Sequence, residues 1–253
     1  MRNILIVAAV VALSVPSLAF ADSQVAELLA GRLKQCRGCD LHNVSFKRAD
    51  LTGVDFTGAN LSDASFHRAE LKGANFDNAI LTGANFNLSD LSNATFEGAD
   101  ATNALFYQAD LFSAKLDYAK FAGARLQYAR MTKVSARHTD FEAAVMTNAI
   151  ATFADFSNAM LRRVDLSSAN VGNSNFTRAI FDRANLAGGH AGRADFTGAT
   201  IRGADFYGAD LHDADFTNAH ISGCRFTTAD MTDAILTGAS FSQTFMPDAH
   251  FKE

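Results

Sequence analysis

A strict period of five dominates this 253-residue chain: from Leu41 to Phe251, every fifth residue is apolar, most often Leu or Phe. A second column of small residues, mainly Ala, stands two positions before each of these, as at Ala49, Ala59 and Ala64. Apolar residues spaced alternately by two and three fit neither a helix with 3.6 residues per turn nor an alternating strand. The chain must therefore turn a corner in every unit, with two side chains of each unit directed inward.

The last residue of each five-residue unit marks the corner. It is often Gly or Asn, as at Gly53, Gly58 and Asn78. A type II turn needs a positive φ at its third residue, which Gly adopts freely and Asn adopts more readily than most residues. The unit thus carries its own turn signal.

Residues 49–53 (ADLTG) and 59–63 (ANLSD) resemble the A(D/N)LXX unit of the pentapeptide-repeat family. The resemblance extends over residues 39–253 without a change of register. It implies an all-β fold, a right-handed quadrilateral β-helix with four units in each coil. The solenoid would have about eleven coils and, at a strand spacing of about 4.8 Å, a length of about 50 Å.

The first 21 residues have the pattern of a cleaved export signal. Arg2 gives a basic start, an apolar run covers residues 4–13, and Ala19 and Ala21 form a small-x-small cleavage site. The run is shorter than the roughly 20 residues of a spanning helix, which disfavours a membrane anchor. We therefore expect a signal peptide at residues 1–21, no membrane span, and a periplasmic or secreted protein that begins at Asp22.

The two ends of the solenoid are expected to differ. Residues 22–38 are predicted to form an amphipathic helix that caps the first coil, with its apolar residues on one stripe. These residues are Val25, Leu28, Leu29 and Leu33. At the other end the repeats continue to Phe251 with no helix after them, so the last coil would expose apolar side chains and strand edges. We expect a homodimer through this uncapped coil.

The three cysteines have different expected roles. Cys36 and Cys39 form a C-x-x-C sequence at the start of the solenoid, and an oxidising compartment favours a disulfide between them. A thioredoxin-like redox role is the alternative, but no βαβ pattern surrounds them. Cys224 occupies the small-residue column and is predicted to be a buried free thiol.

A cluster of cations interrupts the repeat near the middle of the chain. The position before the central residue is Asp or Asn in 20 of 43 units. Four successive units, which make one full coil, carry a cation there instead: Lys115, Lys120, Arg125 and Arg130. Lys133 and Arg137 are nearby, opposed only by Asp117. We call these six cations the basic belt. Ring-bearing residues stand beside them: Tyr107, Phe112, Tyr118 and Tyr128.

The basic belt has two interpretations. Charge together with aromatic stacking could hold a partner, and Tyr118 and Tyr128 are then part of the site. Alternatively, the cations pair with acidic residues in the coils on either side and serve stability. Small central residues in the same region, Ala101, Ala136 and Ala151, predict a bulge or bend, with Phe153 and Met160 as possible compensation.

No catalytic or metal site emerges from the sequence. A stacking period of twenty would place His190, Asp210, Asp230 and His250 in one column, but parallel outward side chains converge poorly on a metal ion. We expect no cofactor, no metal and no enzyme activity, because flat faces offer no pocket or buried carboxylate pair.

Two functions remain in contention. The first is an exported, non-catalytic scaffold that presents flat charged faces to a protein or an anionic envelope polymer. The second, implied by the family resemblance, is a DNA mimic that inhibits gyrase. Two adjacent acidic faces, through Leu51 and Phe56, favour this function. The export signal disfavours the mimic. A formal net charge of −5 argues against binding of nucleic acid itself.

Overall fold

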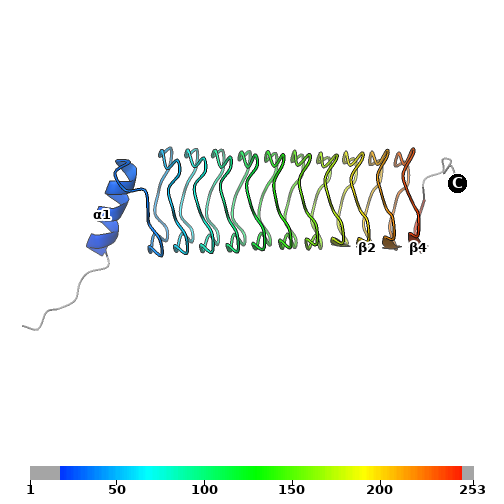
Figure 1. Ribbon diagram of the computed structural model, residues 1–253, viewed down its shortest axis with the longest axis horizontal. Helices are drawn as coiled ribbons and strands as arrows, with labels where there is room; N and C mark the ends of the chain where they lie inside the picture. The colour runs from blue at the N-terminus through cyan, green and yellow to red at the C-terminus, as the bar shows by residue number, and fades with distance from the viewer. Residues whose placement is uncertain (1–17, 247–253) are drawn as a thin grey trace, which may run out of the picture.

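A straight rod of stacked coils makes up nearly all of the computed structural model, which describes residues 18–246 (Figure 1). Parallel bridges join residues twenty positions apart, from Gln35 and Asp55 at one end to Arg225 and Phe245 at the other. Four units therefore complete one coil, and the predicted quadrilateral β-helix is confirmed. Residues 1–17 of the predicted signal peptide, and His250 and Phe251, lie outside the described residues.

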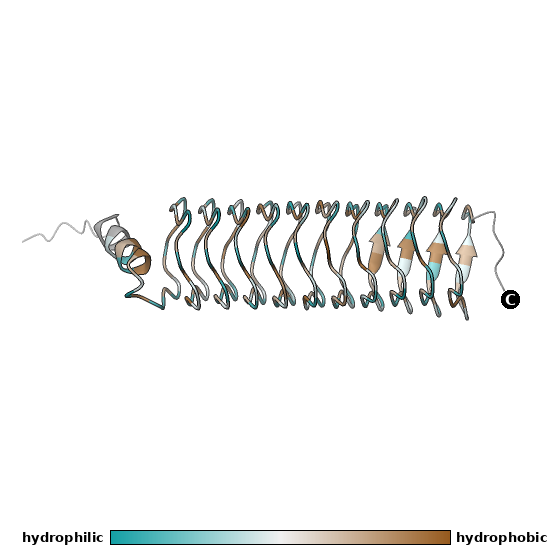
Figure 2. Cartoon of the chain, turned by 90° about the horizontal axis from the view of Figure 1, so that it is seen from above, coloured by the Kyte–Doolittle hydropathy of each residue, from teal (hydrophilic) through white to brown (hydrophobic). Residues whose placement is uncertain are grey.

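The coils have four faces, which we name after the first central residue on each: the Leu41, Phe46, Leu51 and Phe56 faces. Most contacts between coils are single bridges, but the Leu41 face forms a parallel sheet near its C-terminal end (Figure 2). Its strands are short and are arranged in chain order: β1 (Ile180–Asp182), β2 (Thr200–Arg202), β3 (His220–Ser222) and β4 (Ser240–Ser242).

Backbone hydrogen bonds explain the five-residue unit. Phe86 N donates to Leu105 O of the next coil at 2.7 Å, and Leu105 N donates back to Ala84 O at 2.9 Å. Ala84 N also closes the corner by donating to Leu81 O at 2.9 Å. The amide after the central residue has no place in this ladder, and an Asp or Asn two positions earlier often accepts from it, as Asp50 does from Thr52 N at 3.0 Å. The preference for Asp or Asn in the unit follows from this cap.

The corner residue keeps a positive φ whatever its side chain. Asn78 has φ 58° and Gly58 has φ 66°, as the sequence predicts. Arg48, Tyr128 and Phe153 have nearly the same angle, although their side chains disfavour it. The stack of neighbouring coils therefore imposes a positive φ on residues whose side chains disfavour it.

Two columns of aromatic rings fill the N-terminal half of the core. On the Phe46 face, Phe66 and Phe86 stack with ring centroids 4.8 Å apart and planes 4° apart. Phe76 and Phe96 stack in the same way on the opposite Phe56 face, at 4.9 Å. The columns meet edge to face, as Phe76 and Phe86 do at 5.5 Å and 82°. The rod interior is thus a dry, interlocked stack of rings.

The predicted bulge or bend in the middle is wrong. Bridges continue at the same spacing through residues 101–160, and the rod is straight in both views (Figures 1 and 2). Phe121 and Phe141 move the ring column to the Leu41 face and fill the space beside the small central residues. Phe153 is 59% exposed and cannot compensate for them.

Helix α1, Leu18–Leu29, lies at the N-terminal end of the rod, beside the first coil (Figure 1). It ends well before residue 38, because Gly31 has φ 67° and donates to Leu28 O, while Arg32 N donates to Glu27 O. Cleavage after Ala21 would leave the rest of the helix on the rod. Leu28 is fully buried in the core, whereas Leu29, predicted on the same stripe, is half exposed.

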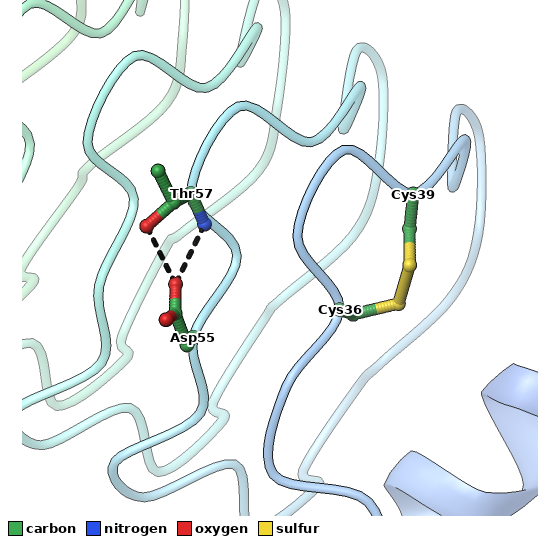
Figure 3. The surroundings of a disulfide bond; sticks show 4 residues. All are labelled: Cys36, Cys39, Asp55 and Thr57. Atoms are coloured by element: carbon green, nitrogen blue, oxygen red, sulfur yellow. Dashed lines mark hydrogen bonds between the residues drawn. A yellow bond between two sulfur atoms is a disulfide. The ribbon is translucent and has the colours of Figure 1, made fainter.

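A disulfide joins Cys36 and Cys39 around one corner of the first coil (Figure 3). Cys36 takes the inward position that Leu or Phe holds elsewhere and is 2% exposed. Its amide donates to Asp55 O, so residues predicted as helix already belong to the β-helix. Cys224 is a buried free thiol, as predicted, and burial raises its pKa.

No described element covers the last coil of residues 18–246. Phe241 and Phe245 are exposed, and β4 pairs with β3 on one side only. Within the described range, no helix is long and apolar enough to cross a membrane.

Candidate binding surface on the middle coils

Four cations of the basic belt occupy equivalent outward positions on the four faces of one coil. Bridge partners place Lys115 between Thr95 and Ser135, and Arg125 between Leu105 and Val145. Lys120 follows Asp100 and Arg130 follows Asp110 in their own columns. The structure therefore brings these predicted residues together as a ring of charge around the rod.

These four cations replace the side chains that cap the repeat. Where Asp100 precedes Thr102, its carboxylate accepts from Thr102 N at 3.1 Å. In the described chain, the amide two positions after each of the four cations donates to no side-chain acceptor; these amides belong to residues 117, 122, 127 and 132. Because Lys and Arg have no acceptor atom, a full coil gives up a stabilising feature of the repeat.

Half of the basic belt is neutralised by neighbouring carboxylates. Arg130 Nη1 lies 2.9 Å from Asp110 Oδ2. Lys120 Nζ lies 3.7 Å from Asp100 Oδ2. Arg137 pairs with Asp117. The interpretation in which the cations pair with acidic residues of neighbouring coils is therefore correct for these three cations.

Asp117 is the firmest of these partners, because its side chain is only 5% exposed. Its Oδ1 accepts from Ser135 Oγ at 2.7 Å and from Arg137 N at 2.9 Å. Burial raises the pKa of Asp117, but the bonds from Arg137 and Ser135 outweigh it, so the pKa lies below its ordinary value. Arg137 is thus held as part of the coil.

The other three cations have no carboxylate partner within the described residues: Lys115, Arg125 and Lys133. Lys133 Nζ lies 6.0 Å from the ring centroid of Phe112. These three charges face solvent on an acidic chain and are available to a partner.

Aromatic side chains stand next to the basic belt, as predicted. Tyr107 and Tyr128 meet edge to face with centroids 5.8 Å apart. Tyr118 stacks on His138 at 5.0 Å with planes 4° apart. Their rings are exposed, in contrast to the Phe rings of the core.

Two exposed apolar residues in this region were not predicted as surface groups. Ile150 is 45% exposed and follows Arg130 in its column, and Phe153 projects from a corner. The sequence does carry a signal for Phe153, because it occupies the corner position of its unit rather than the central one.

The histidine column contains a local ion pair. Asp210 Oδ1 lies 2.6 Å from His212 Nδ1, and His190 Nδ1 lies 3.8 Å from Asp210 Oδ2. The hydrogen bond and charge of Asp210 raise the pKa of His212. Over residues 18–246, no group of three His, Cys, Asp or Glu side chains is arranged to hold a metal ion.

Comparison with protein families identifies this architecture. A pentapeptide repeat region model matches residues 32–106, and a model of pentapeptide repeats in eight copies matches segments from residue 89 to residue 246. The chain belongs to the pentapeptide-repeat family. No curated protein matches the sequence.

The comparison with solved structures finds other pentapeptide repeat proteins among the similar chains. HetL of the cyanobacterium Nostoc sp. strain PCC 7120, a pentapeptide repeat protein involved in heterocyst differentiation regulation, is 29% identical over 91% of this chain and 98% of its own, with a TM-score of 0.51. QnrB1, a plasmid-mediated fluoroquinolone resistance protein, is 18% identical over 79% of this chain and 91% of its own, with a TM-score of 0.48. A pentapeptide repeat protein of the Arabidopsis thaliana thylakoid lumen is 33% identical over 36% and 66% respectively, with a TM-score of 0.31.

Proposed function

We propose that this protein is an exported, non-catalytic binding scaffold that holds an anionic partner at the basic belt. The observation that carries the proposal is the set of unpaired cations, Lys115, Arg125 and Lys133, on a chain of net charge −5. Lys115 and Arg125 also stand where Asp or Asn would cap the coil. Neither side chain can accept the amide hydrogen bond that Asp or Asn accepts at that position, and both attract negative charge.

A polyanion column tests the role of the basic belt. The triple variant K115Q/R125Q/K133Q should elute from dextran sulfate resin at lower salt than the wild type, because charge attraction to exposed groups is screened by salt. The matched control is R48Q/R68Q/K72Q, which removes the same charge from the first coils. Equal elution of the two triple variants would show that general charge, rather than the basic belt, governs binding.

Export is the second part of the proposal. The signal pattern at residues 1–21 motivates it, and the Cys36–Cys39 disulfide is compatible with an oxidising compartment. Fractionation and N-terminal sequencing of the native protein should find a chain that begins at Asp22 outside the cytoplasm. An intact Met1 in the cytoplasm would contradict export and make gyrase inhibition by the acidic faces the next assay.

We also propose that two copies pair through the uncovered last coil. Phe241 and Phe245 are exposed beside the edge of β4 that pairs with no other described strand, and they support this contact. Light scattering at micromolar concentration should give twice the chain mass, and F241S/F245S should reduce it to one. A wild-type monomer would remove the proposal.

A further inference from the structure

Ring-bearing side chains at left-handed corners occur in one short part of the described chain. Corner residues with positive φ run from Gly38 to Gln243, and most are Gly, Asn or another polar residue. The ring-bearing members all lie between residues 118 and 153: Tyr118, Tyr128, His138 and Phe153. A bulky side chain is disfavoured at this φ, so each position departs from the local preference of the fold.

Burial does not compensate for this strain. Tyr128 is 48% exposed and Phe153 is 59% exposed, whereas the core Phe rings are fully buried. The fold gains a favourable turn from neither residue. Tyr128 meets only the exposed ring of Tyr107, edge to face, and Phe153 has no ring neighbour in the described chain. Local preferences are broken in this way most often at functional sites.

Tyr128 and Phe153 stand at the two edges of one face. Tyr128 ends a unit of the Phe46 face and precedes Arg130, while Phe153 ends a unit of the Leu51 face. Between these edges lie the outward residues Phe112 and Ile150, and Lys133 occupies the same corner column as Phe153 one coil earlier. We call Phe112, Tyr128, Lys133, Ile150 and Phe153 the Leu51-face patch.

The Leu51-face patch differs from the rest of the same face. In the column of Phe112, earlier coils carry Thr52, Lys72 and Ser92, and later ones carry Gly172 and Gly192. In the column of Ile150, four earlier coils carry carboxylates, the last of which pairs with Arg130: Asp50, Glu70, Asp90 and Asp110. An apolar patch thus follows an acidic stretch on one flat surface, and its exposed rings have the composition of protein-binding hot spots.

We infer that the Leu51-face patch binds a protein segment that carries both apolar and carboxylate side chains; this inference rests on the proposed function and specifies its partner. Phe112, Ile150 and Phe153 supply the apolar contact. Lys133, over the Phe112 ring and without a carboxylate of its own among the described residues, supplies the charge that complements an acidic side chain. A sugar polyanion would satisfy Lys133 but would leave the apolar side chains against polar groups.

The test uses substitutions that the fold already accepts. In Y128N/F153N, Asn replaces each ring at a corner, as Asn78 and Asn93 do naturally, so thermal stability should be equal or higher. The matched control Y118N/H138N makes the same changes at the corner that follows the Phe56 face. Both variants keep all six cations of the basic belt.

Randomised dodecapeptides selected on the wild-type protein should be enriched in acidic and apolar residues together. Selected peptides should bind Y128N/F153N at least about tenfold more weakly by fluorescence polarisation, as expected for loss of anchor rings, and Y118N/H138N unchanged. Failure to select such peptides, or equal binding to Y128N/F153N, would overturn the inference.

The same assay separates the inference from the proposed function. If K115Q/R125Q/K133Q loses dextran sulfate binding while Y128N/F153N keeps full peptide affinity, the basic belt remains and the Leu51-face patch is wrong. If dextran sulfate displaces the selected peptides as well as an acidic, apolar peptide does, the partner is a polyanion. If, in addition, K115Q/R125Q/K133Q elutes from dextran sulfate resin at the same salt concentration as its control R48Q/R68Q/K72Q, both proposals fail.

Discussion

Replacement of Phe86 by Ala tests whether the stacked rings, rather than buried area alone, stabilise the rod. Phe86 is fully buried and has four ring neighbours, with centroid distances of 4.8 Å to Phe66, 5.5 Å to Phe76, 6.1 Å to Phe96 and 5.0 Å to Phe106. A buried Phe to Ala change costs about 3–5 kcal/mol, and each ring pair adds about 0.5–1.5 kcal/mol beyond burial. We expect F86A to lower the free energy of unfolding by about 5 kcal/mol.

Phe141 provides a matched control inside the rod. It is also fully buried, but it has two ring neighbours, Phe121 at 5.6 Å and Phe156 at 5.8 Å, and neither is parallel to it. Urea unfolding followed by circular dichroism should show that F86A costs about 1–3 kcal/mol more than F141A. Equal losses would refute the reasoning, because buried area would then account for both.

Three smaller predictions concern polar and covalent contacts. D117A should lower the free energy of unfolding by about 2–3 kcal/mol in urea titration, because the buried carboxylate holds several hydrogen bonds. Asp210 raises the pKa of His212, so this pair stabilises the fold below pH about 6.5, and stability should fall by a few tenths of a kcal/mol as pH rises through the raised pKa. H212Q should lack this slope. C36A/C39A should weaken the first coil by about 1–2 kcal/mol, seen as faster amide exchange there but not in distant coils.

The sequence predicts the fold well because each unit repeats the same local rule. The inward columns and the corner at Gly53 or Asn78 can be read directly from the spacing. The end of α1 could not, because Cys36 replaces the usual Leu or Phe and hides the first unit of the solenoid. The ladder bonds from Cys36 N to Asp55 O and from Asp55 N to Lys34 O show that the β-helix has already begun.

The candidate site was predicted in part. The position of the basic belt follows from the period of five, but the pairing of its members depends on which residue lies twenty positions away. Asp110 therefore neutralises Arg130, while Leu105 and Val145 leave Arg125 unpaired. The prediction that Phe153 fills the core failed because a large ring was assigned by its type rather than by its corner position.

Photo-crosslinking in the native cell tests most directly that the middle of the rod binds a partner. Benzoylphenylalanine replaces the exposed ring of Phe153 in one variant and that of Tyr207, on the Phe46 face, in the other. Irradiation should give a discrete higher-mass adduct in the exported fraction from the Phe153 position and none from the Tyr207 position. No adduct from Phe153, or equal adducts from both positions, would contradict a binding site on the middle coils.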